Sequence, residues 1–449
     1  MIANPMPVLP AAELAGFVSV LAETETRVLV GSVVDMAGVA RAKTVPAGRA
    51  AAFHVAGMGA SPTWNVFCID NTIAFTDRLG VVGDLRLRAD LAALRVLGDG
   101  YAWAPAEFFT QDGDPVAGCA RGRLRELQAR AEAAGLSMLA GSELEFTLTD
   151  ADGGAPFGRQ WQAYGLGAVF DVEELIAELT VDFASAGLPV EQVHAEYGSG
   201  QYEVSIAPAE PLQAADHVVL GRLVIGRVAR RHGLKVSFSP LPFAGGAGNG
   251  AHLHLSFAGD GVPLLSGGTG PHGLTERGQA ALAGILAGLP ELLAVFAGSV
   301  LSASRLRPGL WSGAFACWGL ENREAALRFV AATGGNPSGA SIELKCIDPS
   351  ANPYLAVATM LGLALDGMER SAVLPAEITS DPLGVEGTLR LADNQADTLD
   401  AFGSSALARR LLGEEIVEAL LAVRRHEQRT YADPTLGEIT ERFRFAWSC

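Results

Sequence analysis

Four short segments that alternate polar and apolar residues constrain the fold of this chain most. They are GSELEF at 141–146, GQYEVS at 200–205, HLHLSF at 252–257 and SIELK at 341–345. Side chains of a β-strand point to opposite faces in turn, so each segment has one polar and one apolar face. Such strands form a sheet that packs its apolar face on helices and lines a cavity with its polar face. The sequence therefore predicts a curved sheet with one functional face.

Acidic side chains dominate the polar faces of these segments. A pair of glutamates in one strand is most often solvated on an edge strand, and a lone histidine is most often a hydrogen-bonded core residue. Together, however, ionised carboxylates about 4 Å apart repel by about 4 kcal/mol per pair at an effective dielectric near 20, so the cluster requires cations. The residues expected to meet in the cavity are Glu143, Glu145, Glu196, Glu203, His252 and Glu343.

Oxygen ligands with a single imidazole favour Mg²⁺ or Mn²⁺ over zinc, and two ions suit this number of ligands. Paired divalent ions most often serve phosphoryl transfer, which also needs basic partners. The segment 303–328 supplies arginines, although Arg323 and Arg328 could also lie on a solvated helix face. No GxxxxGK[ST] loop occurs, and the Gly-rich run before His252 leads into a strand, which argues against P-loop and dinucleotide folds.

The length of 449 residues predicts two unequal domains, with a boundary in the turn-rich segment 110–118. We place the domains at 1–112 and 113–449. The sequence predicts a hairpin over 26–46 and a helix over 121–135. It also predicts a helix from Asn352-Pro353 and another around 406–429.

The net charge of −17 argues against nucleic acid and anionic membranes as partners. Five cysteines without a CxxC pair favour reduced thiols, and the N-terminus lacks the pattern of a secretory signal, so we expect a cytoplasmic protein. The most apolar tract, 278–303, contains Pro290 and Glu291 near its middle. We expect these residues to divide it into two core or interface helices, too short to span a bilayer.

The blocks GSELEF, EYGSGQYEVS, GNGAHLHLS, ENREAALR and SIELKCIDPSANPYLA, in this order, resemble the glutamine synthetase superfamily. The N-terminal DMAGVARAKTVP and VGDLRLRAD resemble its small domain. The resemblance implies an α+β protein, with an N-terminal β-grasp-like domain and a larger catalytic domain built on a curved antiparallel sheet. It also implies phosphorylation of glutamate by ATP, displacement of phosphate by an amine, and a dodecamer of two hexameric rings with active sites between subunits.

The resemblance also assigns roles by matching position. It implies one metal held by Glu145, Glu196 and Glu203, and a second metal, which accompanies ATP, held by Glu143, His252 and Glu343. Asn249, Gly250 and Arg305 match positions that hold glutamate. Arg323 and Arg328 match residues that steady the transferred phosphoryl group, with Arg328 also near ATP. His254 and Ser256 match nucleotide contacts.

Two departures from the family pattern bear on the substrate. Ammonia-using members read PGYE in a mobile flap, whereas this chain reads PGLW and places Trp311 where the glutamate stands. Tryptophan offers an apolar wall or a cation–π face to a larger amine, although it could also simply pack the flap. Ser341 and Lys345 replace the arginines of the usual RxExR, which redistributes the grip on glutamate or phosphate.

Similar variants occur in the branch of the family that joins glutamate to polyamines or ethanolamine. The sequence therefore predicts an ATP-dependent ligase that joins the γ-carboxylate of glutamate to an organic amine. The alternatives are glutamine synthetase proper and a catalytically silent family member that serves assembly or regulation.

Overall fold

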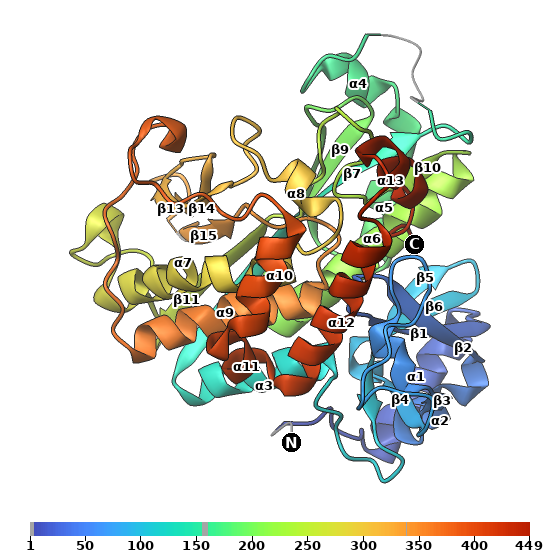
Figure 1. The fold of residues 1–449 in the computed structure, drawn as a ribbon. Coiled ribbons are helices and arrows are strands. Elements are labelled where there is room, and N and C mark those ends of the chain that lie inside the picture. The colour runs from blue at the N-terminus through green and yellow to red at the C-terminus, as the bar shows by residue number, and fades with distance from the viewer. Residues whose placement is uncertain (1–3, 155–159, 338) are drawn as a thin grey trace.

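The structure, a computed structural model, describes residues 4–154, 160–337 and 339–449. It contains two β-sheets: a smaller one at the lower right of Figure 1, and a larger one whose strands extend from β13–β15 at the left to β7 and β9 at the upper right. The smaller sheet belongs to the N-terminal part of the chain, drawn in blue, and the larger sheet belongs to the rest. The mixed α+β architecture agrees with the expected fold class.

The N-terminal sheet has the strand order β2-β1-β6-β4-β3, with β5 paired to β6. The strands β1 and β2 form the predicted hairpin, and their antiparallel register joins Val28 to Pro46 and Val34 to Ala40. Two helices, α1 and α2, belong to this unit. The bounds are α1 Ala11–Glu23, β1 Val28–Val34, β2 Ala40–Pro46, α2 Ala50–Val55, β3 Met58–Ala60, β4 Leu85–Ala89, β5 Arg95–Gly98 and β6 Tyr101–Phe109.

The larger sheet has the order β13-β14-β15-β11-β7-β9-β8, with β10 paired to β7 and β12 to β11. It contains all four alternating segments, in β7, β9, β11 and β15, which confirms the predicted common sheet. One pair departs from the antiparallel expectation, because β13 and β14 run parallel. The bounds are β7 Leu136–Thr149, β8 Val190–Ala195, β9 Gln201–Ala209, β10 Lys235–Ser237, β11 Leu253–Gly259, β12 Val262–Pro263, β13 Phe315–Leu320, β14 Ala325–Val330 and β15 Ser341–Leu344.

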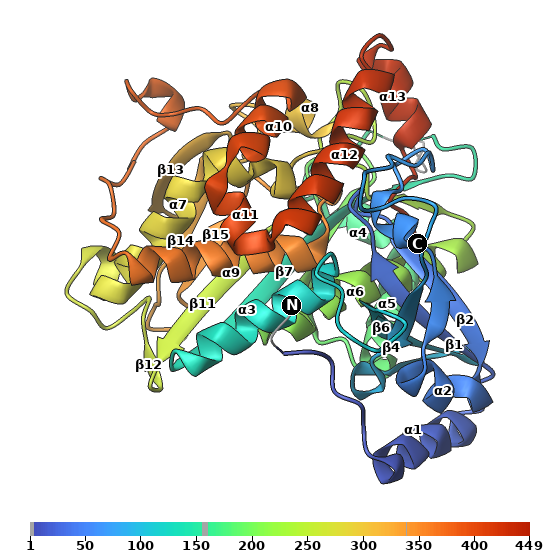
Figure 2. The ribbon, with the colours of Figure 1, turned by 60° about the horizontal axis from the view of Figure 1, so that its bottom comes forward.

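Helices cover the apolar face of this sheet. Figures 1 and 2 show α3 and α9 crossing β7 and β11, with α7 beside α9. The apolar residues of the alternating segments lie on this covered face, where Leu144, Phe146, Leu253 and Ile342 are buried. The helix bounds are α3 Ala120–Ala133, α4 Leu166–Phe170, α5 Glu173–Ser185, α6 Pro211–Arg231, α7 Glu276–Phe296, α8 Ser302–Arg305, α9 Pro353–Glu369, α10 Gln395–Ser404, α11 Ala406–Leu412, α12 Glu414–Thr430 and α13 Leu436–Phe443.

Two helix predictions need correction. The expected break at Pro290 is wrong, because α7 runs through it without interruption. Proline removes only its own backbone hydrogen bond, and packing against α9 holds the rest of this buried helix. The expected single helix around 406–429 is two helices, because Gly413 adopts φ 85° between α11 and α12. Glycine accepts this left-handed conformation without steric penalty.

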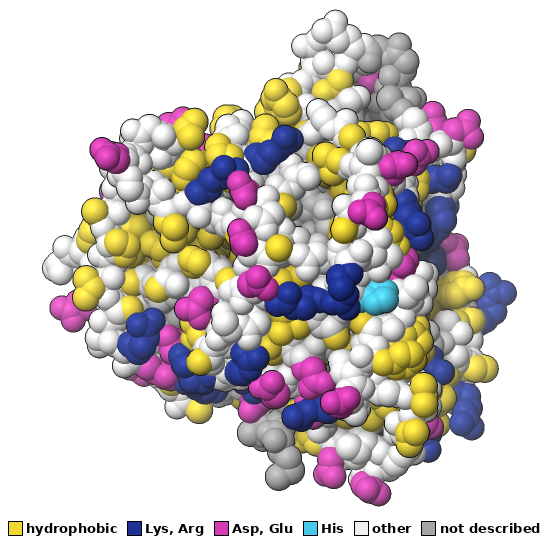
Figure 3. All heavy atoms as spheres, viewed as in Figure 1, with side chains coloured by type: hydrophobic (Ala, Val, Ile, Leu, Met, Phe, Trp, Pro, Cys, Tyr) yellow, Lys and Arg dark blue, Asp and Glu magenta, His cyan; other side chains and the backbone are white. Residues whose placement is uncertain are grey.

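The helix α7 is long and apolar enough to cross a membrane, alone among the helices of the described ranges. Its most apolar window is 78% buried inside the protein, so α7 is a core helix here. The face drawn in Figure 3 has a short row of basic side chains beside a histidine near its centre, with acidic and basic side chains mixed elsewhere. All five cysteines are free thiols.

A buried ion-pair network joins the two units behind the larger sheet. Arg121 at the start of α3 binds Glu107 at 2.6 Å, Asp90 at 2.9 Å and Asp216 at 2.8 Å. Tyr354 of α9 donates to the same Asp216 at 2.8 Å. Strands β4 and β6 are thereby tied to helices α3, α6 and α9. The domain boundary near 112 stays a prediction.

Candidate active site

The strand register brings the acidic side chains together. Glu145 of β7 is the register partner of Glu203 of β9. Across β11, His254 is the register partner of Glu343 of β15. Because alternate residues share a face, these partners and their neighbours two residues away point into the same hollow. The candidate site is therefore assembled from β7, β9, β15 and the entry to β11.

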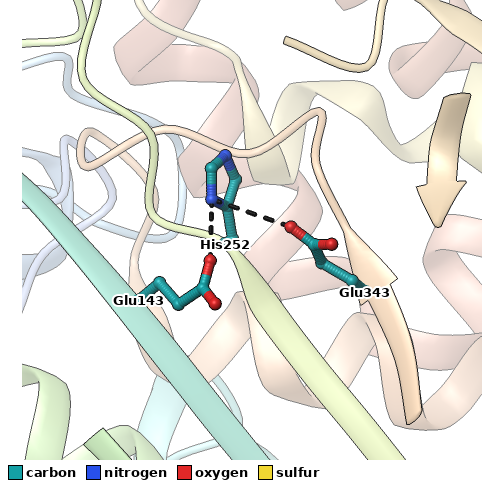
Figure 4. Close-up of side chains that lie close together, drawn as sticks. All are labelled: Glu143, His252 and Glu343. Carbon is teal, nitrogen blue, oxygen red and sulfur yellow. Dashed lines mark hydrogen bonds and ion pairs between the residues drawn. The ribbon is translucent and has the colours of Figure 1, made fainter. Parts of the chain in front are cut away.

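A first group able to hold a metal consists of Glu143, His252 and Glu343, which point toward one another in Figure 4. The Nδ1 atom of His252 lies 3.1 Å from Oε2 of Glu143 and 3.8 Å from Oε1 of Glu343. The other oxygen of Glu143 lies 3.3 Å from Nε2 of His254. Burial alone raises the pKa of Glu143, but hydrogen bonds from the two histidines hold it well below its usual value.

A second group consists of Glu145, Glu203 and His252, and a third of His194, Glu196 and Glu203. Sequence reasoning placed Glu145, Glu196 and Glu203 around one metal. In the structure Glu203 belongs to both groups, Glu145 adjoins His252, and Glu196 adjoins His194 at 3.0 Å. Burial, and then the charges of the neighbouring glutamates, raises the pKa of Glu203 to about 10. This cluster carries more negative charge than its own side chains balance.

Several residues that orient this cluster escaped the sequence analysis. Gln201 donates to Oε2 of Glu145 at 2.9 Å, and His194 accompanies Glu196. Each lies two residues before a glutamate already singled out, so the period of two that identified Glu196 and Glu203 also indicates them. Tyr164 stacks on His194 with ring centroids 6.4 Å apart. Burial and the nearby charge of Glu196 raise the pKa of Tyr164 to about 12.

The expected glutamate-holding residues lie beside the second group. A Cβ atom on Gly250 would meet Nη2 of Arg305 at 2.8 Å and Oε1 of Glu145 at 3.0 Å, so only glycine leaves this space open. Arg305 is 5% exposed, and its Nη1 atom has no hydrogen-bond partner in the described part of the chain. A buried guanidinium nitrogen without a partner fits an anionic ligand group.

Asn249 takes a different position from the one expected of a side chain that contacts substrate. Its Nδ2 atom donates to the carbonyls of Ser237 at 3.2 Å and Ser239 at 3.0 Å. Its Oδ1 atom accepts from Gln201 at 3.0 Å and Thr147 at 3.2 Å. The backbone N–H of Asn249 also donates, to the carbonyl of Pro240 at 3.0 Å. Asn249 therefore holds the entry to the strand in place.

The phosphate-side residues surround Glu343. The Nζ atom of Lys345 lies 3.1 Å from its Oε1, and Nη1 of Arg328 lies 2.9 Å from its Oε2. Arg328 also pairs with Glu321 and belongs to strand β14, so it is not on a solvated helix face. His254 shares a hydrogen bond of 3.1 Å with Ser341, and Ser256 follows it on the same face of β11.

The flap, residues 308–311, is exposed at Leu310 and Trp311. Trp311 has φ 52° and is 53% exposed, and its backbone N–H donates to Glu324 at 2.9 Å. The guanidinium carbon of Arg323 lies 5.9 Å from the centroid of the Trp311 ring. The charge of Arg323 also acts on Tyr164. One arginine thus connects the flap with the aromatic residue beside Glu196. Glu324 lies in the quoted block ENREAALR, but no feature of that block indicates its role.

Comparison with known proteins identifies the family. The glutamine synthetase catalytic domain matches residues 117–439. The chain belongs to the glutamine synthetase family. Gamma-glutamylpolyamine synthetase GlnA3 of Streptomyces coelicolor is 43% identical over 406 residues, covering 87% of this chain and 87% of the relative. A glutamine synthetase of Methanocaldococcus jannaschii is 32% identical over 372 residues, covering 77% and 79%.

Solved structures agree with this glutamine synthetase fold. A structure described as a novel glutamine synthase homolog has a TM-score of 0.85 at 32% identity and covers 94% of this chain and 99% of its own. A complex of GmaS with ADP has a TM-score of 0.84 at 28% identity, covering 93% and 97%. The predicted family and fold are confirmed.

A glutamine synthetase catalytic domain implies ATP and divalent metal ions, and the residues present fit them. The three groups offer carboxylate oxygens with one imidazole each, and the ligand atoms in a group lie within 4.8 Å of one another. Hard divalent cations prefer such oxygen-rich sets. Burial, and then the charges of the neighbouring glutamates, raises the pKa of Glu203, and a divalent cation beside it would favour its ionised form.

Proposed function

We propose that the protein joins the γ-carboxylate of glutamate to an organic amine, using ATP and releasing ADP and phosphate. The observation that carries the choice of amine is Trp311, an exposed residue in the flap at the position where ammonia-using members carry a glutamate. The Streptomyces relative named gamma-glutamylpolyamine synthetase supports the same substrate class. The structural likeness to a GmaS complex that holds ADP supports the nucleotide.

In this proposal Glu145, Glu196 and Glu203 bind the metal nearer glutamate, with His194 beside them. Glu143, His252 and Glu343 bind the metal that accompanies ATP. Mg²⁺ or Mn²⁺ held by these residues would neutralise the negative charge that moves with the phosphoryl group. Gln201 orients Glu145, and His252 and His254 orient Glu143.

Glutamate binds at the opening beside Gly250, where the unpartnered nitrogen of Arg305 receives a carboxylate. An oxygen of its γ-carboxylate attacks the γ-phosphorus of ATP, and ADP leaves. Arg323 and Arg328 steady the negative charge on the transferred group, and Lys345 lies on the same side. The amine nitrogen then attacks the carbonyl carbon of γ-glutamyl phosphate, loses a proton, and displaces phosphate.

The amine enters beside the flap. One face of Trp311 is engaged by Arg323, so its remaining exposed surface forms an apolar wall. Tyr164 supplies a second aromatic surface next to Glu196, whose carboxylate attracts a protonated amine. Ammonium, which is small and strongly hydrated, gains little from aromatic walls, whereas an alkylamine buries its carbon chain against them.

The test is phosphate release with glutamate, ATP, Mg²⁺ and a panel of amines that includes ammonium, ethanolamine, short alkylamines and polyamines. We expect wild type to prefer an organic amine by kcat/KM. Trp311→Glu should shift the ratio toward ammonium, since it restores a carboxylate and removes the wall. Trp311→Phe, which keeps an aromatic face, should retain the wild-type preference. Preference of wild type for ammonium over every amine tested would reject the proposal.

Glutamine synthetase proper is the second candidate, since many relatives carry that name, including the one from Clostridium saccharobutylicum at 30% identity over 353 residues. It predicts ammonium as the best substrate in the same assay. A silent assembly protein predicts no phosphate release with any amine. The acidic groups argue against a catalytically silent protein, because a role in assembly does not require several carboxylates that repel one another to be buried together.

Assembly and location complete the proposal. By family membership we propose a dodecamer of two stacked hexameric rings, with glutamate and the amine as small-molecule partners. Free cysteines are compatible with the expected cytoplasmic location. Light scattering of the purified protein measures the mass: a value near twelve chains supports the stacked rings, and a monomer mass contradicts them.

A further inference from the structure

Lys345 holds one oxygen of Glu343, a member of the proposed metal group that accompanies ATP. Its Nζ atom lies 3.1 Å from Oε1, while Nη1 of Arg328 lies 2.9 Å from Oε2. Glu343 is 1% exposed and Lys345 is 3% exposed, so bulk water screens neither charge. Both oxygens of this carboxylate are therefore paired with cations that belong to the chain.

The backbone of Lys345 is fixed, and in the described part of the chain Glu343 is the hydrogen-bond partner of its side chain. Its N–H donates to the carbonyl of Ala326 at 2.9 Å, and its own carbonyl accepts from Arg305 at 3.4 Å. The side chain of Lys345 makes its hydrogen bond with Glu343. A lysine ammonium is a compact charge on a flexible stem, unlike the rigid fork of arginine. It can leave one oxygen for another while the backbone stays in place.

We propose that Lys345 is an internal counter-ion that competes with the divalent cation for Glu343. Without metal the ammonium neutralises Oε1, opposite Glu143 and His252. Binding of the cation displaces the ammonium, which remains in the site because its backbone is fixed. Anionic oxygens of the nucleotide then become its partners. The inference rests on the proposed metal role of this group, and it does not depend on which amine is the substrate.

This competition couples the cation to the nucleotide. Without nucleotide the cation must displace a buried ion pair, so its affinity for this group is reduced. With nucleotide the displaced ammonium gains new anionic partners, so the penalty shrinks. By linkage, nucleotide tightens the cation to the same degree that the cation tightens nucleotide. The group would then receive its metal together with ATP rather than hold it permanently.

The experiment is a calorimetric titration of the purified full chain with Mn²⁺, without nucleotide and with saturating ADP. Without nucleotide, Lys345→Met and Lys345→Gln should bind Mn²⁺ at least about tenfold more tightly than wild type, because a buried positive charge next to a ligand is removed. Lys345→Arg should stay close to wild type. Saturating ADP should reduce the difference in Mn²⁺ affinity between wild type and the neutral variants. Lys235→Met, which removes an exposed lysine lying over Phe445, should leave Mn²⁺ affinity unchanged.

Two results would overturn the inference: unchanged or weaker Mn²⁺ binding in both neutral variants, or a gain in affinity that persists when Glu143→Gln is added to Lys345→Met. The second result would place the effect outside this group. If Lys345→Met fails to fold by circular dichroism, Lys345→Gln, which keeps a donor for Glu343, decides. Amine turnover is measured separately. An amine preference that fails leaves these Mn²⁺ affinities intact, and unchanged affinities leave the amine preference intact.

Discussion

Two buried charge clusters in this protein differ in how their carboxylates are neutralised. Behind the larger sheet, Arg121 and Arg125 form ion pairs and hydrogen bonds of 2.6–3.1 Å with the carboxylates of Asp90, Glu107 and Asp216. Despite burial, which raises it, the two arginines hold the pKa of Asp90 below its ordinary value. This network contains its own counter-charges, and its effect is to join the two sheets through helix α3.

On the polar face of the larger sheet, positively charged side chains neutralise the carboxylates only in part. Glu343 has Lys345 and Arg328, and its pKa falls to about 2 despite burial. Within the described residues, Glu203 forms no ion pair with a lysine or arginine. Burial, and then the charges of the neighbouring glutamates, raises its pKa to about 10, although the charge of Lys345 acts in the opposite direction. A cluster built for stability balances its charge within the chain, whereas a cluster built for metal and phosphate leaves charge for the ligands to balance.

The largest effect is expected where the unbalanced cluster loses a ligand. Glu145→Ala and Glu203→Ala should abolish turnover, because each removes a metal-binding carboxylate, while folding persists because repulsion is relieved. Steady-state phosphate release and circular dichroism measure the two properties. Glu191→Ala, an exposed glutamate on β8, is the matched control and should keep wild-type activity. Near-normal activity in Glu145→Ala or Glu203→Ala would contradict the metal assignment.

Loss of the positive charge of Arg323 should have the next largest effect on activity. Arg323→Ala should slow phosphoryl transfer by about 10³-fold or more, the scale seen when an arginine that stabilises the transferred phosphoryl group is lost. Rapid-quench measurement of ADP formation tests this step directly. Because Arg323 also contacts Trp311, the amine KM is measured in parallel. A defect confined to the glutamate KM would instead place Arg323 in substrate binding.

Substitutions in the ion-pair network around Arg121 should lower the stability of the fold rather than the catalytic rate. Arg121→Met leaves three buried carboxylates without their main partner and should lower the free energy of unfolding by about 3–5 kcal/mol. Arg130→Met on the same helix removes a half-exposed pair with Glu369 and should cost less than about 1 kcal/mol. Urea titrations compare the two variants. Equal stability losses would mean that the network does not join the units.

The smallest expected effect is the pH dependence of the unbalanced cluster. The pKa of Glu203 rises from 4.5 to about 10 on folding, so the metal-free native protein holds a proton that the unfolded chain has released between these values. Its stability should therefore fall as pH rises through this window. We expect the melting temperature of wild type to drop by roughly a few degrees between pH 6 and 9 relative to Glu203→Gln.

Mn²⁺ provides the control for this comparison. The cation replaces the proton as the partner of Glu203, so saturating Mn²⁺ should flatten the difference between wild type and Glu203→Gln. Arg121→Met keeps all the proposed metal ligands, so Mn²⁺ should raise its melting temperature by about as much as it raises that of wild type. A pH dependence that Mn²⁺ leaves unchanged would assign it to other titrating groups.

The sequence by itself determined the elements and the polar face. The period of two in GSELEF and SIELK is a local property of a strand, so it identified Glu143, Glu145 and Glu343 as members of one surface before their neighbours were known. The matching blocks then predicted the family, which the catalytic-domain match confirmed. Local signals also located the hairpin and the helix capped by Asn352.

Only the tertiary structure decided how these residues are partnered. Glu203 lies in one group with Glu145 and His252 and in another with Glu196 and His194. This double membership depends on strand register and side-chain direction, which a linear pattern does not encode. The continuity of α7 through Pro290 was likewise decided by packing against α9, because long-range burial outweighs one lost hydrogen bond. Counter-charges come from distant segments, so the balance that separates the two clusters emerges only when the chain is folded.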